Sequence, residues 1–154
     1  MFRIPPRAIP AGSWQAAGGV FAKLIPRAPV PIRRYGQRAR APIGNNGIDQ
    51  TVIAAGGAGT ASVGPQGWGT RWYPQQVTIA TATGPNDTST VTFYLGAIAS
   101  SQIVGTSSAG GGDTIGLAVP MMQPGDLLIA VWTGGNPGDW ASMAVIGDQE
   151  VAVT

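Results

Sequence analysis

The stretch QVTIATATGPNDTSTVTFYLGAI, residues 76–98, decides the fold class of this chain. Residues 76–83 and 89–98 each alternate large apolar side chains with smaller or polar ones, which is the period of a half-buried β-strand. Between them, GPND at 84–87 has the proline of a tight turn at its second position. We expect the two strands to pair as a hairpin.

Further short strands are predicted on the C-terminal side of this pair. SQIVGT and TIGLAVP are two of them, and DLLIAVWT (126–133) is so apolar that we expect it to be central and buried on both faces. WASMAVIGDQEVAVT (140–154) gives one or two closing strands, with a turn at Gly147 and Asp148. Short strands separated by Gly/Pro turns predict an all-β fold, an antiparallel β-sandwich or jelly roll over about residues 51–154.

The chain divides by composition into three parts. Residues 69–154 form the predicted β-sandwich domain, and the Gly-rich residues 44–68 are predicted to be a linker that leads into a first, weak strand. Residues 1–43 are a basic arm. Eight of the nine basic residues lie in 1–40 and all seven acidic residues lie later, so 1–40 carries a formal charge of +8 and 41–154 one of −6.

The arm is expected to be extended, because seven of the 13 prolines fall in residues 1–42 and each removes a backbone donor. Within it, SWQAAGGVFAKL (13–24) alone has helical spacing, which Gly18 and Gly19 weaken. A targeting signal is not indicated, since the prolines interrupt it. A disordered linker or a nucleic-acid tail would not need the many interspersed apolar side chains.

Isoleucines between prolines are good anchors for a protein groove, and arginines pair with carboxylates. We therefore expect the arm to dock on other proteins. Its candidate interface residues are Arg3, Ile4, Arg7, Ile9, Trp14, Phe21, Lys23, Arg27, Ile32, Arg33, Arg34, Tyr35, Arg38 and Arg40.

The composition excludes much chemistry. The chain has neither cysteine nor histidine, which removes disulfides, thiolate metal sites and Ser-His triads. The aspartates lie beside Gly/Pro turns, where local backbone bonds explain them; Asp148 and Glu150 are spaced to share a strand face. We expect no catalytic, cofactor or metal site and no membrane insertion. A charged fraction of 10% suits a subunit covered by neighbours or a sandwich with Ser/Thr/Gln on its surface.

Aromatic residues form a second candidate surface. Trp68, Trp72 and Tyr73 gather around Arg71 in GWGTRWYPQQ, and Trp140 follows a Gly/Pro loop. Exposed Trp and Tyr side chains stack on sugar rings or anchor protein interfaces, whereas buried ones pack in cores. Both interpretations stay open for Trp68 and Trp72.

Three stretches, GTRWYPQQVTIAT, STVTFYLGAI and MQPGDLLIAVWTGGNPGDW, lie within roughly residues 69–140, about half the chain. They resemble small virion proteins of long-tailed phages that infect actinobacteria, usually called minor tail proteins. The resemblance implies a non-enzymatic tail component, made in the host cytoplasm, with other virion proteins and copies of itself as partners. The alternatives are a capsid decoration or head-fibre protein, or a receptor- or glycan-binding module of the virion. Nucleic acid is not an expected partner.

Overall fold

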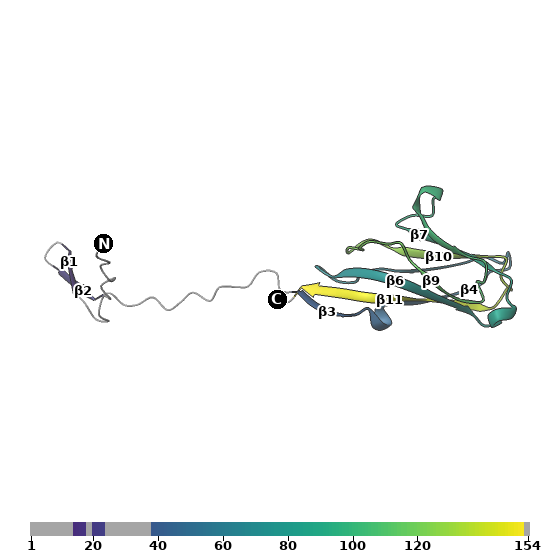
Figure 1. The fold of residues 1–154 in the computed structure, drawn as a ribbon, viewed down its shortest axis with the longest axis horizontal. Helices are drawn as coiled ribbons and strands as arrows, with labels where there is room; N and C mark the ends of the chain where they lie inside the picture. The colour runs from purple at the N-terminus through teal and green to yellow at the C-terminus, as the bar shows by residue number, and fades with distance from the viewer. Residues whose placement is uncertain (1–13, 18–19, 24–37, 153–154) are drawn as a thin grey trace, which may run out of the picture. The chain divides into compact units, whose positions relative to one another are not determined.

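The computed structural model describes residues 14–17, 20–23 and 38–152 (Figure 1). The chain divides into two units, with the boundary between residues 35 and 36. In the described part of the second unit, a four-stranded and a five-stranded antiparallel sheet pack face to face. The predicted all-β sandwich is therefore confirmed.

The strands of the sandwich follow one another with no α-helix among the described residues. The four-stranded sheet has the order β5-β10-β7-β8, and the five-stranded sheet has the order β3-β11-β6-β9 with β4 also paired to β11. Their bounds are β3 Arg38–Pro42, β4 Ile48–Val52, β5 Gly59–Val63, β6 Arg71–Thr81, β7 Thr90–Leu95, β8 Ile103–Ser107, β9 Gly112–Gly116, β10 Leu128–Thr133 and β11 Trp140–Ala152. Three 3-10 turns complete the set: η1 Gly44–Gly47, η2 Gly84–Asn86 and η3 Ser100–Gln102.

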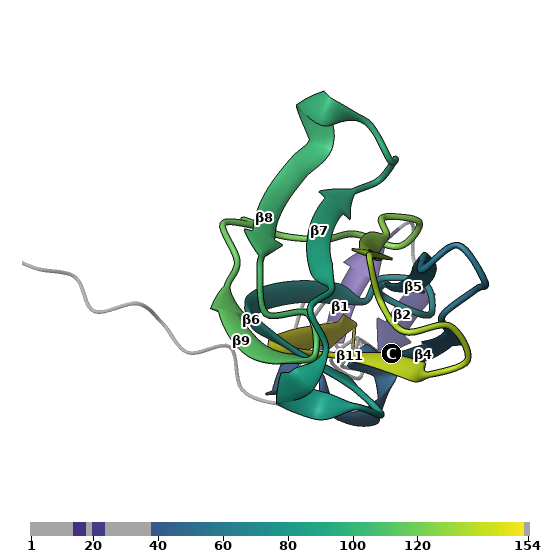
Figure 2. The same cartoon turned by 90° about the vertical axis from the view of Figure 1, so that its right-hand side faces the viewer.

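The pairing of the eight strands β4 to β11 is nested. The first pairs with the last, β4 with β11, and then β5 pairs with β10, β6 with β9 and β7 with β8. This is the pattern of one long antiparallel ribbon whose tip is the β7–β8 connection, which projects from the sandwich in Figures 1 and 2. Additional pairing of β6 with β11 and of β7 with β10 rolls the ribbon into two layers.

The predicted hairpin between residues 76–83 and 89–98 is wrong. These strands, β6 and β7, lie in different sheets and face each other across the core. The glycine loop before β9 forms hydrogen bonds with the backbone at the end of β6 and just before β7. Thr81 N–H donates to Gly111 O (3.1 Å), and Gly110 N–H donates to Ser89 O (2.8 Å). The turn at 84–87 forms η2 and connects the sheets instead of closing a hairpin.

The core lies between the two inner faces. As predicted, β10 is central, and from Leu128 to Trp132 every residue except half-buried Val131 is buried. The indole N–H of Trp132 donates to Gly110 O at 3.2 Å. The largest fully buried side chains around it are Trp72, Phe93, Ile43, Ile53, Ile79, Met122, Leu128 and Met143.

Residues 44–68 contain a strand as predicted, but they hold a second one as well, and no part of them is a linker. They hold β4 and β5, whose pairing with β11 and β10 places one at the edge of each sheet. Ile53, Ala61 and Val63 from this segment are buried in the core. The sandwich therefore begins well before residue 69.

The predicted arm also ends too late. Arg38–Pro42 form β3, which pairs antiparallel with the end of β11, and Ile43 is buried. The last six residues of the predicted arm, 38–43, thus belong to the sandwich.

The closing segment is one strand, β11, which is one of the two predicted possibilities, but the turn predicted at Gly147 and Asp148 is wrong. Its 13 residues run straight through Gly147, opposite a bulge in β6, where Gln75 is the extra residue. A Cβ on Gly147 would overlap the carbonyl oxygen of Tyr73, so glycine allows the two backbones to approach. The glycine therefore marks a close contact between strands rather than a reversal.

The first unit contains one described hairpin, formed by β1 Trp14–Ala17 and β2 Val20–Lys23 in antiparallel pairing. The helical interpretation of residues 13–24 is therefore wrong. Trp14 pairs with Lys23 and Ala17 with Val20, which is incompatible with a helix through these residues.

Candidate functional site

The end of the five-stranded sheet that carries β3 gathers the three arginines of the described sandwich and two of its seven acidic residues. Here β3, β11 and β6 lie side by side, with Glu150 opposite both Arg40 and Arg71, and Asp148 opposite Tyr73. Trp72 between Arg71 and Tyr73 is fully buried, so its two neighbours project to the outer face. The fold therefore brings residues from three distant parts of the sequence onto one surface.

Glu150 is the centre of an ion cluster on this surface. Its carboxylate lies 4.0 Å from Arg38 Nη1 and 3.9 Å from Arg40 Nε, and it accepts a hydrogen bond from the Tyr73 hydroxyl at 3.1 Å. Asp148 lies 3.9 Å from Arg40 Nε, and the Arg40 guanidinium stands over the Tyr73 ring at 5.2 Å. Arg38 and Arg40 thus pair with carboxylates of their own chain. Their assignment to a free arm is wrong, because β3 is a strand of the sheet.

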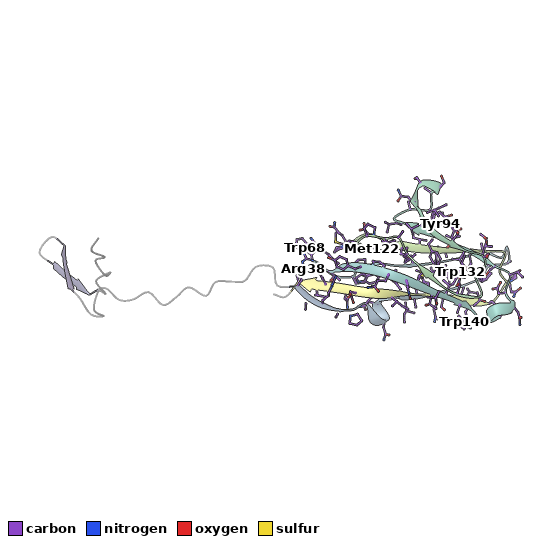
Figure 3. All side chains as sticks on the ribbon, in the orientation of Figure 1. Arg38, Trp68, Tyr94, Met122, Trp132 and Trp140 are labelled. Atoms are coloured by element: carbon purple, nitrogen blue, oxygen red, sulfur yellow. The ribbon has the colours of Figure 1, made fainter. Side chains whose placement is uncertain are left out.

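A cavity of about 410 Å³ opens beside this cluster. It is lined by Arg38, Trp68, Gly69, Thr70, Arg71, Gln123 and Pro124. Figure 3 shows Arg38 and Trp68 near each other at this end of the sandwich. The lining contains two guanidinium groups and no carboxylate, so it is a local positive region.

Hydrogen bonds to backbone groups hold the walls of the cavity. Trp72 and Met122 exchange backbone hydrogen bonds of 3.0 and 2.9 Å, which fix the segment with Gln123 and Pro124 against β6. Asp126 accepts a bond from the Gln123 N–H at 2.7 Å. On the other wall, Arg38 Nη1 donates to Gly69 O at 3.3 Å. These contacts come from β3, from the start of β6 and from the turn before β10.

The predicted aromatic surface is divided by the structure. Trp68 is 99% exposed and lines the cavity with Arg71. Trp72 belongs to the core, so its assignment to a contact surface is wrong; its position on the inner face of β6 is the reason. Tyr73 is half-buried in the ion cluster, and Trp140 lies at the other end of β11 (Figure 3).

Most of the remaining candidate interface residues of the arm lie outside the residues that the structure describes. Trp14, Phe21 and Lys23 lie in the β1–β2 hairpin, and their backbones alone are described. The residues Arg3, Ile4, Arg7, Ile9, Arg27, Ile32, Arg33, Arg34 and Tyr35 lie outside the described residues.

The other carboxylates hold local structure. Asp49 accepts a bond from Ser62 N–H, Asp87 from Ser89 N–H and Asp113 from the Ser107 hydroxyl, at 2.7, 2.8 and 2.6 Å. Asp139 accepts bonds from the backbone and hydroxyl of Thr83. Within residues 14–17, 20–23 and 38–152, no three acidic side chains gather in a way that could hold a metal ion.

Sequence reasoning missed Gln123 and Pro124 as neighbours of Trp68. They are about fifty residues away in the sequence, and the Trp72–Met122 bridge that joins the two segments has no signal in composition or periodicity. Alternation along β6 could have assigned Trp72 to the core, but the bulge at Gln75 shifts the alternation by one residue.

Comparison of the sequence with models of known protein families and with curated proteins gives no match. Among the described residues, no helix has the length and apolar character needed to cross a membrane. The second unit of the chain is therefore a β-sandwich with an ion cluster and a positive cavity at the edge that carries β3.

We expect the ion cluster to stabilise the pairing of β3 with β11. Glu150→Gln should speed amide hydrogen exchange at residues 38–42 several-fold while lowering the global free energy of unfolding by only about 1 kcal/mol, because partly exposed pairs contribute little individually. Asp148→Asn, which removes one contact to Arg40, is the matched control and should have a smaller effect. Equal exchange in all three proteins would show that the cluster does not hold β3.

Proposed function

We propose that this chain is a non-enzymatic structural subunit of a phage virion, a minor tail component whose segment before β3 joins it to neighbouring subunits. The sandwich supports this proposal through its strand order. Nested pairing of eight strands in the sheets β4-β11-β6-β9 and β5-β10-β7-β8 is the order of a jelly roll. That architecture recurs in viral capsid and lectin domains.

The observation that carries the proposal is the attachment of the chain at β3. The strand pairs with β11 over Arg38–Pro42, the ion cluster holds its side chains, and Ile43 anchors the next residue in the core. A segment that joins subunits must be attached firmly to its own domain, since a force on the segment is transmitted to the sandwich at β3. The sequence upstream supplies the cations and the apolar side chains for contacts with other chains.

The outer face of the five-stranded sheet also suits a crowded assembly. Exposed Ile48 and Val52 on β4 lie beside Ala144 and Trp140 on β11, and Ile146 continues the row. The positions between them on β4, β6 and β11 are Gln50, Thr78, Ala80 and Ser142, so this part of the face carries no charge. A surface of this kind is typical of contact with other protein copies. The engagement of the carboxylates in turns and in the ion cluster supports a non-enzymatic role.

The test is incorporation into particles. The phage gene would be inactivated and complemented with the wild-type chain or with a triple variant, Arg27→Gln, Arg33→Gln and Arg34→Gln, which leaves the described sandwich unchanged. Mass spectrometry of purified particles should find the wild-type chain and at least ten-fold less of the variant. Equal incorporation would contradict the joining role, and absence of the wild-type chain from particles would contradict the virion assignment.

The alternative location is the head, as a decoration or head-fibre protein with the same attachment. Antibodies against the sandwich, used for gold labelling of intact particles, separate the two locations. Labelling on the tail supports the proposal as stated, whereas labelling on the capsid supports the alternative.

A further inference from the structure

Trp68 is the most exposed large apolar side chain among the described residues, at 99%. Its loop is nevertheless anchored at both ends. Gly64 and Pro65 are buried before it and Thr70 is buried after it, with the Thr70 N–H 3.4 Å from Gly67 O. An indole on an anchored loop that contacts almost none of its own chain offers a flat apolar face to a ligand.

Arg71 supplies the second recognition element. It lies in β6, which is paired on both sides at this end, with β11 through Glu150 and with Met122 through the backbone of Trp72. No described carboxylate lies within salt-bridge distance of Arg71, and Glu150, opposite it on β11, contacts Arg38, Arg40 and Tyr73 instead. A positioned guanidinium without an acidic partner can bind a carboxylate or phosphate with two parallel hydrogen bonds.

The cavity joins these two groups. Its volume of about 410 Å³ falls within the range of small-ligand sites, and Gln123 adds an exposed amide to the lining. A ligand that fits must combine an apolar face, hydroxyl groups and one acidic substituent. We propose that this cavity binds an acidic saccharide unit, whose ring stacks on Trp68 and whose carboxylate or phosphate pairs with Arg71.

A nucleic acid strand combines stacking faces with phosphates as well, but it requires a basic track along the protein surface. The described sandwich has three arginines and seven acidic residues, and Asp148, Glu150 and Asp126 lie next to the cavity region. The positive region is therefore confined to the cavity, which favours a short ligand with a local charge. The proposal concerns sandwich residues alone, so it can fail or hold independently of the virion assignment.

The experiment is an NMR titration of the full chain with glucuronic acid and with glucose 6-phosphate, with glucose as the neutral control. The Trp68 indole N–H resonance, assigned by its loss in Trp68→Ala, should shift with both acids, and at least one should bind ten-fold more tightly than glucose. Which acid binds better identifies the acidic group as carboxylate or phosphate.

Variants locate the site. Trp68→Ala and Arg71→Gln should each weaken binding of the preferred acid at least ten-fold, while Trp140→Ala, at the other end of β11, should leave it unchanged. Thermal unfolding of each variant checks that the fold is kept. Unchanged binding in Trp68→Ala and Arg71→Gln, or no binding of either acid, would overturn the proposal. So would tighter binding of a short oligothymidylate than of both acids, which would assign the cavity to nucleic acid.

Discussion

Replacing Trp132 with alanine should lower the free energy of unfolding of the sandwich by about 3–5 kcal/mol, the range measured for large-to-small changes in well-packed cores. Trp132 is fully buried on the central strand β10, where the surrounding strands leave little freedom for the core to collapse. The change also removes the indole donor of Gly110 O, which holds the glycine loop. Urea unfolding followed by far-ultraviolet circular dichroism measures the effect.

Two further tryptophans serve as controls for this experiment. Trp68→Ala removes the same side chain from a position that is 99% exposed and should change the free energy of unfolding by less than about 0.5 kcal/mol. Trp72 is equally buried as Trp132, but its indole nitrogen has no hydrogen-bond partner among the described residues. Trp132→Phe should therefore cost more than Trp72→Phe. A loss below 1 kcal/mol for Trp132→Ala would contradict the core described above.

The positions of most strands could be predicted from the sequence, but their partners could not. Alternation in residues 76–83 and 89–98 correctly identifies two strands with one buried face each. It determines which face is buried and contains no information about the neighbouring strand. The short connection suggests a hairpin, yet the loop before β9, distant in the sequence, occupies the hydrogen-bonding groups at the ends of both strands.

Small residues made the first strands of the sandwich hard to recognise, so that a linker and one weak strand were predicted where the chain has β4 and β5. β5 has the sequence GTASV, which is weak in strand-forming residues, although alternate positions are fully buried. A Cβ on Gly59 would lie 2.8 Å from Ile53 Cδ1 and 3.0 Å from Thr51 Cγ2, so a larger residue there would displace these side chains. Tight packing therefore selects the residues that composition alone attributes to a linker.

The candidate site was predictable only in part, because some of its residues are neighbours in the sequence and others are brought there by strand pairing. Trp68 and Arg71 lie close in the sequence and line the same cavity, so the local cluster was enough to group these two residues. Assigning Trp72 to the core and Tyr73 to the outer face required the start of β6 and its bulge at Gln75, and neither has a sequence signal. The arrival of Arg38 at the cavity depends on β3 pairing with β11, more than one hundred positions later in the chain.

Gly111→Ala should cost about 2–3 kcal/mol, since overpacking against a rigid neighbour cannot be relieved by rotating a side chain. A Cβ at Gly111 would overlap the carbonyl oxygen of Gly84 and lie 2.8 Å from Asp87 Cβ. To relieve this, the loop must move away from η2, which breaks the 3.1 Å bond from Thr81 N–H to Gly111 O. The joint between β6 and β7, and with it the connection between the two sheets, would loosen.

Gly112→Ala is the matched control one position along the chain. A Cβ there meets no atom within 4 Å, and the residue is an exposed strand position. Alanine should leave the free energy of unfolding unchanged or raise it by up to about 1 kcal/mol, because it restricts the unfolded chain. Urea unfolding of both variants gives the comparison. Similar free energies of unfolding for the two variants would mean that the loop does not pack against η2, because close packing at Gly111 is what should distinguish the adjacent glycines. The expected difference of about 2 kcal/mol or more is large enough to measure reliably.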